Sequence, residues 1–322
     1  MNVSTSRDRL WQKRLNELSA VWPDFMSGRT TGLHKTRVAS RRIREALPIV
    51  AVAAPPDKVK KLDKRMRSLT RTLGPIRELD VELALLEDRA ASDGSSGRAL
   101  EIVRREIASR RQALRKELED DAPISDLKKL LKKLERVAGG KGTKPRGHKA
   151  ARRIEVEWRG VLAARLMRRA KRVGAALEDA GPLYAPDRLH AVRISTKKLR
   201  YALEIARDAG AAGVAPLLKV LKRHQERLGH LHDLQMLLKH VRETETSPGA
   251  GSRMNEFAAY ADSLERECRR LHAVFVDHRG ELTTVVKQIR QQVVPALTTP
   301  PRRQAHVPAR ERSSDHARVR AK

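Results

Sequence analysis

Apolar residues recur three and four positions apart along most of the chain, which is the spacing of amphipathic helices. Residues 7–26, for example, place Leu10, Leu15, Leu18 and Phe25 on one side of a predicted helix. The same spacing predicts further helices over 33–47, 57–72, 75–90, 97–120, 124–137, 149–179, 189–203, 214–228, 253–277 and 280–293. No segment shows the strict alternation of a half-buried strand, so the sequence predicts an all-α protein.

Glycine and proline mark the expected boundaries between these helices. Gly74-Pro75 and Gly181-Pro182 are predicted to end helices. Residues 139–149, GGKGTKPRGHK, have the composition of a linker and separate a first half, 5–138, from a second half, 150–295. Residues 299–322 are rich in proline and arginine and almost free of large apolar side chains, which predicts a disordered basic tail.

One pattern occurs twice, as LHKTRVASRRIREAL at 33–47 and as LHAVRISTKKLRYAL at 189–203. On a helix, one side of the first copy carries His34, Arg37, Arg41 and Arg44. The corresponding side of the second copy carries His190, Arg193, Lys197 and Arg200. The opposite side of each copy is apolar. Matched charge and period indicate two halves related by duplication, each with a cationic face.

The following helix adds a second cationic stripe to each half. In the first half the stripe consists of Lys60, Lys64, Arg67 and Arg71. Aligning Leu228-Gly229 with Leu73-Gly74 sets Lys219 against Lys64 and Lys222 against Arg67. The interval from histidine to glycine is similar in the two halves, 40 residues (34 to 74) and 39 residues (190 to 229). Our hypothesis is that the four stripes line one groove between the halves.

The charge of the chain calls for an anionic partner. The 322 residues contain 69 Lys and Arg against 39 Asp and Glu, a net charge of +30. Nucleic acid, an anionic membrane surface and a free polyanion are the candidates. An aromatic content of 3% disfavours binding of single-stranded nucleic acid, which relies on base stacking. The single cysteine excludes an internal disulfide, and the absence of a signal sequence or a long apolar run predicts a soluble cytoplasmic protein with no membrane contact.

The residue types in the stripes suit phosphate. Guanidinium groups match phosphate oxygens with forked donors, lysine adds point charge and histidine adds a donor. A solvated basic face is the alternative for each stripe taken alone, and His34 and His190 could instead bond locally in the first helical turn. Arg77-Glu78 and the matching His232-Asp233 fit binding and helix-positioning ion pairs equally well.

Catalysis is disfavoured. His-Asp dipeptides occur in metal-dependent phosphohydrolases, but those enzymes need further ligands, and the first half has Arg77-Glu78 at the position of His232-Asp233. The sequence contains no Gly-rich phosphate loop and no zinc-protease motif. We therefore expect a binding protein with no catalytic residues, no metal and no cofactor.

The duplicated motif, followed by LGPIRELDVEL and LGHLHDLQML, resembles the CHAD family over about residues 5–295. This resemblance implies two antiparallel four-helix bundles related by a pseudo-twofold axis, with a basic central cavity. It also implies binding of long-chain inorganic polyphosphate and association with polyphosphate granules. Carried over by position, it adds Arg77 and His232 to the site residues named above. Where the first copy has Asp80 the second has Gln235, so the two halves are expected to bind unequally.

Two alternatives remain beside polyphosphate as the partner. Nucleic acid is the second choice, and the basic tail could bind it even if the groove does not. A helical scaffold that recruits other proteins to granules is the third. The sequence sets neither the oligomeric state nor the preferred length of the polyanion.

Overall fold

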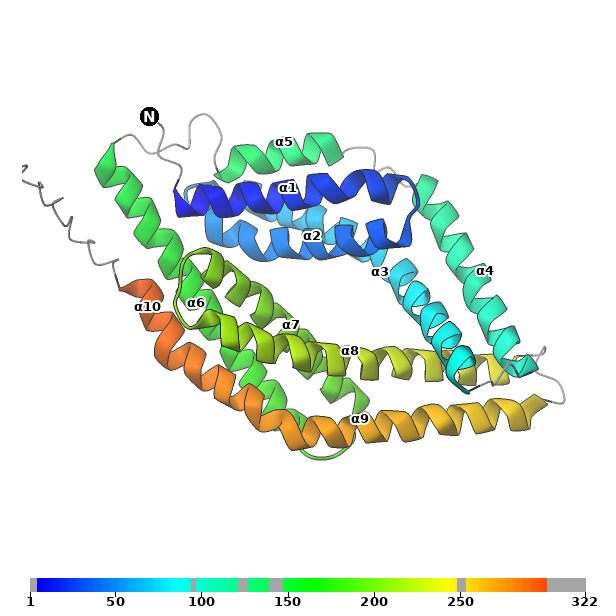
Figure 1. Cartoon of the computed structure of the whole chain (residues 1–322). Coiled ribbons are helices and arrows are strands. Elements are labelled where there is room, and N and C mark those ends of the chain that lie inside the picture. The colour runs from blue at the N-terminus through cyan, green and yellow to red at the C-terminus, as the bar shows by residue number, and fades with distance from the viewer. Residues whose placement is uncertain (1–4, 94–96, 121–126, 139–146, 248–252, 300–322) are drawn as a thin grey trace, which may run out of the picture.

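The computed structural model describes residues 5–93, 97–120, 127–138, 147–247 and 253–299, and every regular element in these ranges is a helix (Figure 1). The helices are α1 (Ser6–Met26), α2 (Thr30–Val50), α3 (Pro56–Asp93), α4 (Arg98–Asp120), α5 (Leu127–Ala138), α6 (His148–Ala180), α7 (Pro186–Asp208), α8 (Val214–Glu245), α9 (Met254–Gln288) and α10 (Val294–Thr298). A π-helical turn, Ile289–Val293, joins α9 to α10. The predicted all-α class is confirmed.

Helices that follow one another in the chain pack side by side. In the first half α1 contacts α2, α2 contacts α3 and α3 contacts α4, while α5 lies on α1 (Figure 1). In the second half α6, α7, α8 and α9 follow the same order, and α10 lies on α6. The halves meet where α2 contacts α7 and α3 contacts α8. The relation of the halves by duplication and a pseudo-twofold axis stays a prediction.

The apolar faces predicted for the two motif helices are buried. Ile43 and Leu47 of α2 and Leu199 and Leu203 of α7 have no exposed surface. Buried hydrophobic residues from both halves join into one cluster that runs from α1 to α10. Because these faces point inward, the cationic sides of α2 and α7 point away from the core.

Predicted helix boundaries are wrong at three places. Gly74-Pro75 lies inside the continuous helix α3, where the apolar period carries on through the buried Leu73 and Ile76. An internal proline removes one backbone hydrogen bond, and burial of this face outweighs that loss. The helix predicted over 214–228 does not end there, since α8 continues through Gly229 to Glu245. The segments predicted as separate helices at 253–277 and 280–293 are joined without a break, because α9 runs to Gln288 and passes directly into the π-helical turn.

Some predictions fall partly outside the described residues. Of the predicted linker 139–149, residues 139–146 lie outside them, and His148 and Lys149 already belong to α6. The predicted tail 299–322 lies outside them except for Thr299.

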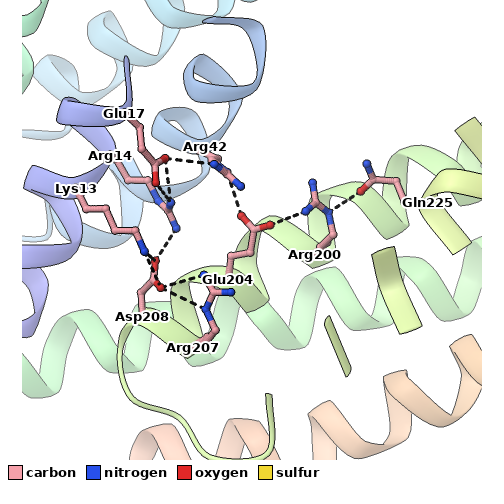
Figure 2. A network of polar contacts seen from close by, with 9 residues as sticks. All are labelled: Lys13, Arg14, Glu17, Arg42, Arg200, Glu204, Arg207, Asp208 and Gln225. Atoms are coloured by element: carbon pink, nitrogen blue, oxygen red, sulfur yellow. Dashed lines mark hydrogen bonds and ion pairs between the residues drawn. The ribbon is translucent and has the colours of Figure 1, made fainter. Parts of the chain in front are cut away.

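A network of ion pairs connects the two halves beside the core (Figure 2). Arg14 of α1 is 2% exposed and contacts Asp208 at the end of α7 at 2.8 Å and Glu17 at 2.9 Å. Arg42 of α2 contacts Glu204 of α7 at 3.1 Å. Arginines of the first half are therefore neutralised by carboxylates of α7, which fixes α7 against α1 and α2.

The same network continues within the second half (Figure 2). Glu204 also accepts a hydrogen bond from Arg200 at 2.6 Å, and Arg200 donates to Gln225 of α8 at 2.6 Å. Lys13 and Arg207 complete the network by pairing with Asp208, each at 3.2 Å.

Replacing Asp208 by Ala should lower the free energy of unfolding by about 2 to 4 kcal/mol, because it leaves the buried guanidinium of Arg14 with only the half-buried Glu17 as a partner. Chemical denaturation measures this loss. Glu101→Ala is the matched control, since Glu101 and Arg104 form an exposed pair on α4 and its loss should destabilise the protein far less than the loss of Asp208. Equal effects of the two substitutions would contradict the structural role of the network.

Candidate functional site

A cavity of about 1030 Å³ lies between α2, α3, α6 and α7, and cationic side chains dominate its lining. The cations are Arg41, Arg44, Lys60, Lys64, Arg67, Arg71, Arg165, Arg169, Lys197 and Lys198. The lining also includes two carboxylates, Glu45 and Asp63, and one aromatic residue, Tyr201. The two halves of the chain together therefore form a strongly positive cavity with few internal counter-ions.

The cavity contains several of the residues predicted from the sequence. Arg41 and Arg44 come from the first motif helix and Lys197 from the second. The predicted stripe of the following helix contributes in full through Lys60, Lys64, Arg67 and Arg71 of α3. The cationic sides of α2, α3 and α7 thus face one space, whereas the hypothesis placed the stripe of 214–228 there as well.

The cationic cluster extends beyond the cavity through Arg37 of α2 and Arg193 of α7. Burial lowers the pKa of Lys197 to about 6, with further lowering by Arg41, Arg193 and other guanidinium groups. Burial also lowers the pKa of Arg41, with further lowering by Arg37. Burial lowers the pKa of Arg193 as well, where Asp233 opposes the shift and Arg41 adds to it. Lys197 is therefore largely neutral at pH 7, and the charged arginines of the cluster repel one another.

The motif histidines have different partners in the two halves. In the first half Arg77 Nε donates to His34 Nδ1 at 3.2 Å. In the second half His190 Nδ1 and His232 Nδ1 lie 3.3 Å apart. Burial and adjacent cations lower the pKa values of His34 and His190, and they lower that of His232 to about 4. These imidazoles are uncharged at neutral pH, so the histidines supply hydrogen-bonding groups rather than charge.

The acidic residues that follow Arg77 and His232 both lie near arginines. Glu78 pairs with Arg37 across α2 and α3 at 3.3 Å. Burial raises the pKa of Asp233, although Arg193 and other cations oppose the rise. For Glu78 the geometry supports the ion-pair alternative. His232 and Arg77 themselves contact the motif histidines.

Nine predicted residues are not part of the cavity lining: His34, Arg37, Arg77, His190, Arg193 and His232, whose contacts are described above, and Arg200, Lys219 and Lys222. Lys219 and Lys222 are exposed on α8, and Lys222 pairs with Glu226 at 3.6 Å. Arg200 belongs to the network that joins the halves. The sequence alignment matched α8 with α3, but α6 and α7 form the cavity wall on that side.

The sequence analysis missed Arg165 and Arg169 of α6 and Lys198 of α7. Arg165 donates to Glu45 Oε1 at 2.6 Å, and Arg169 donates to Glu45 Oε2 at 2.8 Å. Burial raises the pKa of Glu45, but these hydrogen bonds outweigh burial and leave the pKa below its ordinary value. Arg165 and Arg169 are four residues apart and so share one face of α6, which is the sequence signal for a cationic pair. The apolar stripe of the same helix does not reveal it.

Two alternatives can be examined in the described residues. Among them, no three His, Cys, Asp or Glu side chains gather in a way that could hold a metal ion. Nor does any helix there have the length and apolar character needed to cross a bilayer.

The fold and the cavity define an all-α protein with an internal cationic site. The family model described as "CHAD domain" matches residues 9–242, and the chain belongs to the CHAD domain family. CHAD domains are in general non-catalytic binding domains, and the family is linked to polyphosphate binding.

Solved structures share the fold. The crystal structure of the CHAD domain from the plant Ricinus communis superimposes with a TM-score of 0.55 and 22% identity, over 90% of this chain and 92% of that one. PptA from Streptomyces chartreusis gives a TM-score of 0.53 and 15% identity, over 89% of this chain and 98% of that one. The search of curated proteins gives no match.

Replacing Lys197 by Met should stabilise the empty protein at pH 7 by up to about 5 kcal/mol, the linkage limit for a pKa lowered from 10.5 to about 6. The ordinary pKa near 10.5 falls to about 6 on folding, so the unfolded chain binds more protons between these values. Folding therefore bears a cost that is full below pH 6 and disappears as the pH rises toward 10.5. The gain should shrink accordingly from pH 7 to pH 10 in thermal unfolding, and the exposed Lys222→Met is the control. An unchanged free energy of unfolding at pH 7 would contradict the unfavourable burial of the Lys197 amine.

Proposed function

We propose that this protein binds long-chain inorganic polyphosphate in the cavity between α2, α3, α6 and α7, without performing chemistry on it. The observation that carries the proposal is the convergence of cations from both halves on one space, whose described lining contains two carboxylates, Glu45 and Asp63. A polyphosphate chain bears charge at every unit. Its negative charges would offset the repulsion between Arg37, Arg41 and Arg193.

The composition of the cavity favours polyphosphate over nucleic acid. Among the described residues that line the cavity, Tyr201 is the one aromatic residue. Its ring is buried and faces Arg200, whose Cζ lies 4.9 Å from the ring centroid. Bases of a single strand would therefore find no stacking platform there. A polyphosphate chain has no bases and needs only donors and positive charge. Forked guanidinium groups and flexible lysines supply both.

Cellular location follows from the proposed ligand. We propose that polyphosphate binding brings the protein to polyphosphate granules. The scaffold alternative remains distinguishable, because a scaffold would keep its protein partners after polyphosphate is removed by an exopolyphosphatase.

Long-chain polyphosphate should outcompete single- and double-stranded nucleic acid for the protein at about 0.15 M salt. Changing Arg37, Arg41, Arg193 and Lys197 together to Ala should weaken polyphosphate binding at least about a hundredfold, because counterion release scales with the phosphate contacts made. A titration with labelled polyphosphate measures both effects, on the full chain and on a chain shortened after Thr299.

A second variant serves as the charge-matched control. Changing Lys219, Lys222, Arg104 and Arg270 to Ala removes the same formal charge from exposed positions outside the cavity. This variant should bind polyphosphate within about threefold of the unchanged protein. Equal losses in the two variants, or equal competition by nucleic acid, would mean that a diffuse field rather than the cavity attracts polyanions.

Polyphosphate binding should take up protons between pH 6 and pH 8. Bound phosphate favours charged Lys197 and thus raises its pKa from about 6. Four neighbouring groups can also take up protons when phosphate binds: His34, His190, His232 and Asp233. The charges that do not titrate in this range are Arg37, Arg41, Arg193 and Arg200. Calorimetry in two buffers of different ionisation enthalpy counts the protons, and Lys197→Met should lower the count. Affinity independent of pH over this range would argue against binding at the cluster.

A further inference from the structure

The two carboxylates in the cavity are held in different ways. Glu45 is 6% exposed, and each of its oxygens accepts hydrogen bonds from both Arg165 and Arg169 at 2.6 to 3.1 Å. Its side chain joins α2 to α6 and has no freedom to leave its partners. Glu45 is therefore a fixed part of the cavity wall.

Asp63 of α3 is held more loosely. Its Oδ2 accepts a hydrogen bond from Arg67 Nη2 at 2.8 Å, and its Oδ1 accepts a longer one from Arg44 Nε at 3.4 Å. The side chain of Asp63 is 28% exposed and that of Arg67 is 55% exposed. Ion pairs with this exposure contribute little to stability, so the carboxylate can separate from its partners at small cost.

Asp63 lies between Arg44 and Arg67 and accepts a hydrogen bond from each. Both arginines line the cavity from different helices, and both direct donors at the same carboxylate. By contrast, the structure shows no ion pair between a described carboxylate and Lys60, Lys64 or Arg71, which line the same side. The α3 wall thus combines cations open to a ligand with two arginines that already have an anionic partner.

We propose that Asp63 is an internal counter-ion that bound phosphate displaces from Arg44 and Arg67, and that it thereby sets the affinity of the cavity. This inference rests on the proposed function. In the empty protein Asp63 holds the two guanidinium groups in place. On binding, the phosphate chain takes over both arginines, and the displaced carboxylate remains beside an anion. Asp63 is thus a positioning residue that limits affinity and eases release of the ligand.

Replacing Asp63 by Asn tests the inference, because the amide keeps the shape of the side chain and removes its charge. Polyphosphate binding should tighten about threefold to tenfold. The dependence of log K on log salt should steepen by about one, because the two arginines must then recruit an anion from solution that binding releases. Glu101→Gln removes the same charge from the exposed pair on α4 and should leave both quantities unchanged.

A double-mutant cycle separates displacement from a structural role. Arg67→Gln should weaken polyphosphate binding more in the Asp63→Asn background than in the unchanged protein, because in the latter the ligand must first break the pair with Asp63. A merely structural Asp63 would give a weaker binder, with equal losses from Arg67→Gln in both backgrounds. Asp63→Ser provides a second neutral side chain, and circular dichroism confirms that each variant is folded.

The outcomes distinguish this inference from the proposed function. If the unchanged protein fails to bind polyphosphate, the proposed function and the inference fall together. If it binds but neither Asp63→Asn nor Asp63→Ser tightens binding in folded protein, the inference alone is overturned.

Discussion

Repulsion between the cations of α2 and α7 is the constraint on which the rest of the structure depends. These helices meet with Arg37 and Arg41 facing Arg193 and Lys197, and burial together with the neighbouring cations lowers the pKa values of Arg37, Arg41 and Lys197. Such an arrangement persists only because other interactions hold the helices together. The apolar faces of both helices anchor them in the shared core, and ion pairs from Arg14 and Arg42 to α7 join the halves beside the cluster.

Neighbouring arginines of α2 have different roles: one lines the cavity and the next joins the two halves of the chain. Arg41 lines the cavity, while the next residue, Arg42, pairs with Glu204 at 3.1 Å. Residues one apart on a helix point about 100° away from each other, so the same helix presents committed and available arginines to different neighbours. The position of the carboxylates therefore decides which cations hold the fold and which remain for a ligand. Net charge alone does not distinguish these two classes.

The sequence predicted what local periodicity encodes. The helical class and the buried faces of α2 and α7 follow from the spacing of apolar residues, and the arc that contains Arg37 and Arg41 follows from the same geometry. Prediction failed where distant contacts decide. Gly74-Pro75 was interpreted as a break because local propensity favours one, yet tertiary burial keeps α3 continuous. The clamp of Arg165 and Arg169 on Glu45 joins residues about 120 positions apart, which no spacing rule reveals.

Lys219 and Lys222 lie on α8 outside the cavity, so the two halves contribute unequally to the site. Matching the halves residue by residue assumed that α8 repeats the role of α3, but the cavity takes its open cations from α3 and none from α8. The histidine contacts differ in the same sense. His34 faces the permanent charge of Arg77, whereas His190 faces His232, whose pKa is near 4 and which is neutral. Both differences concentrate fixed charge on the first half. A long anion bound at the cluster would therefore lie along α3, with α7 supplying the opposite wall and the proton-binding groups.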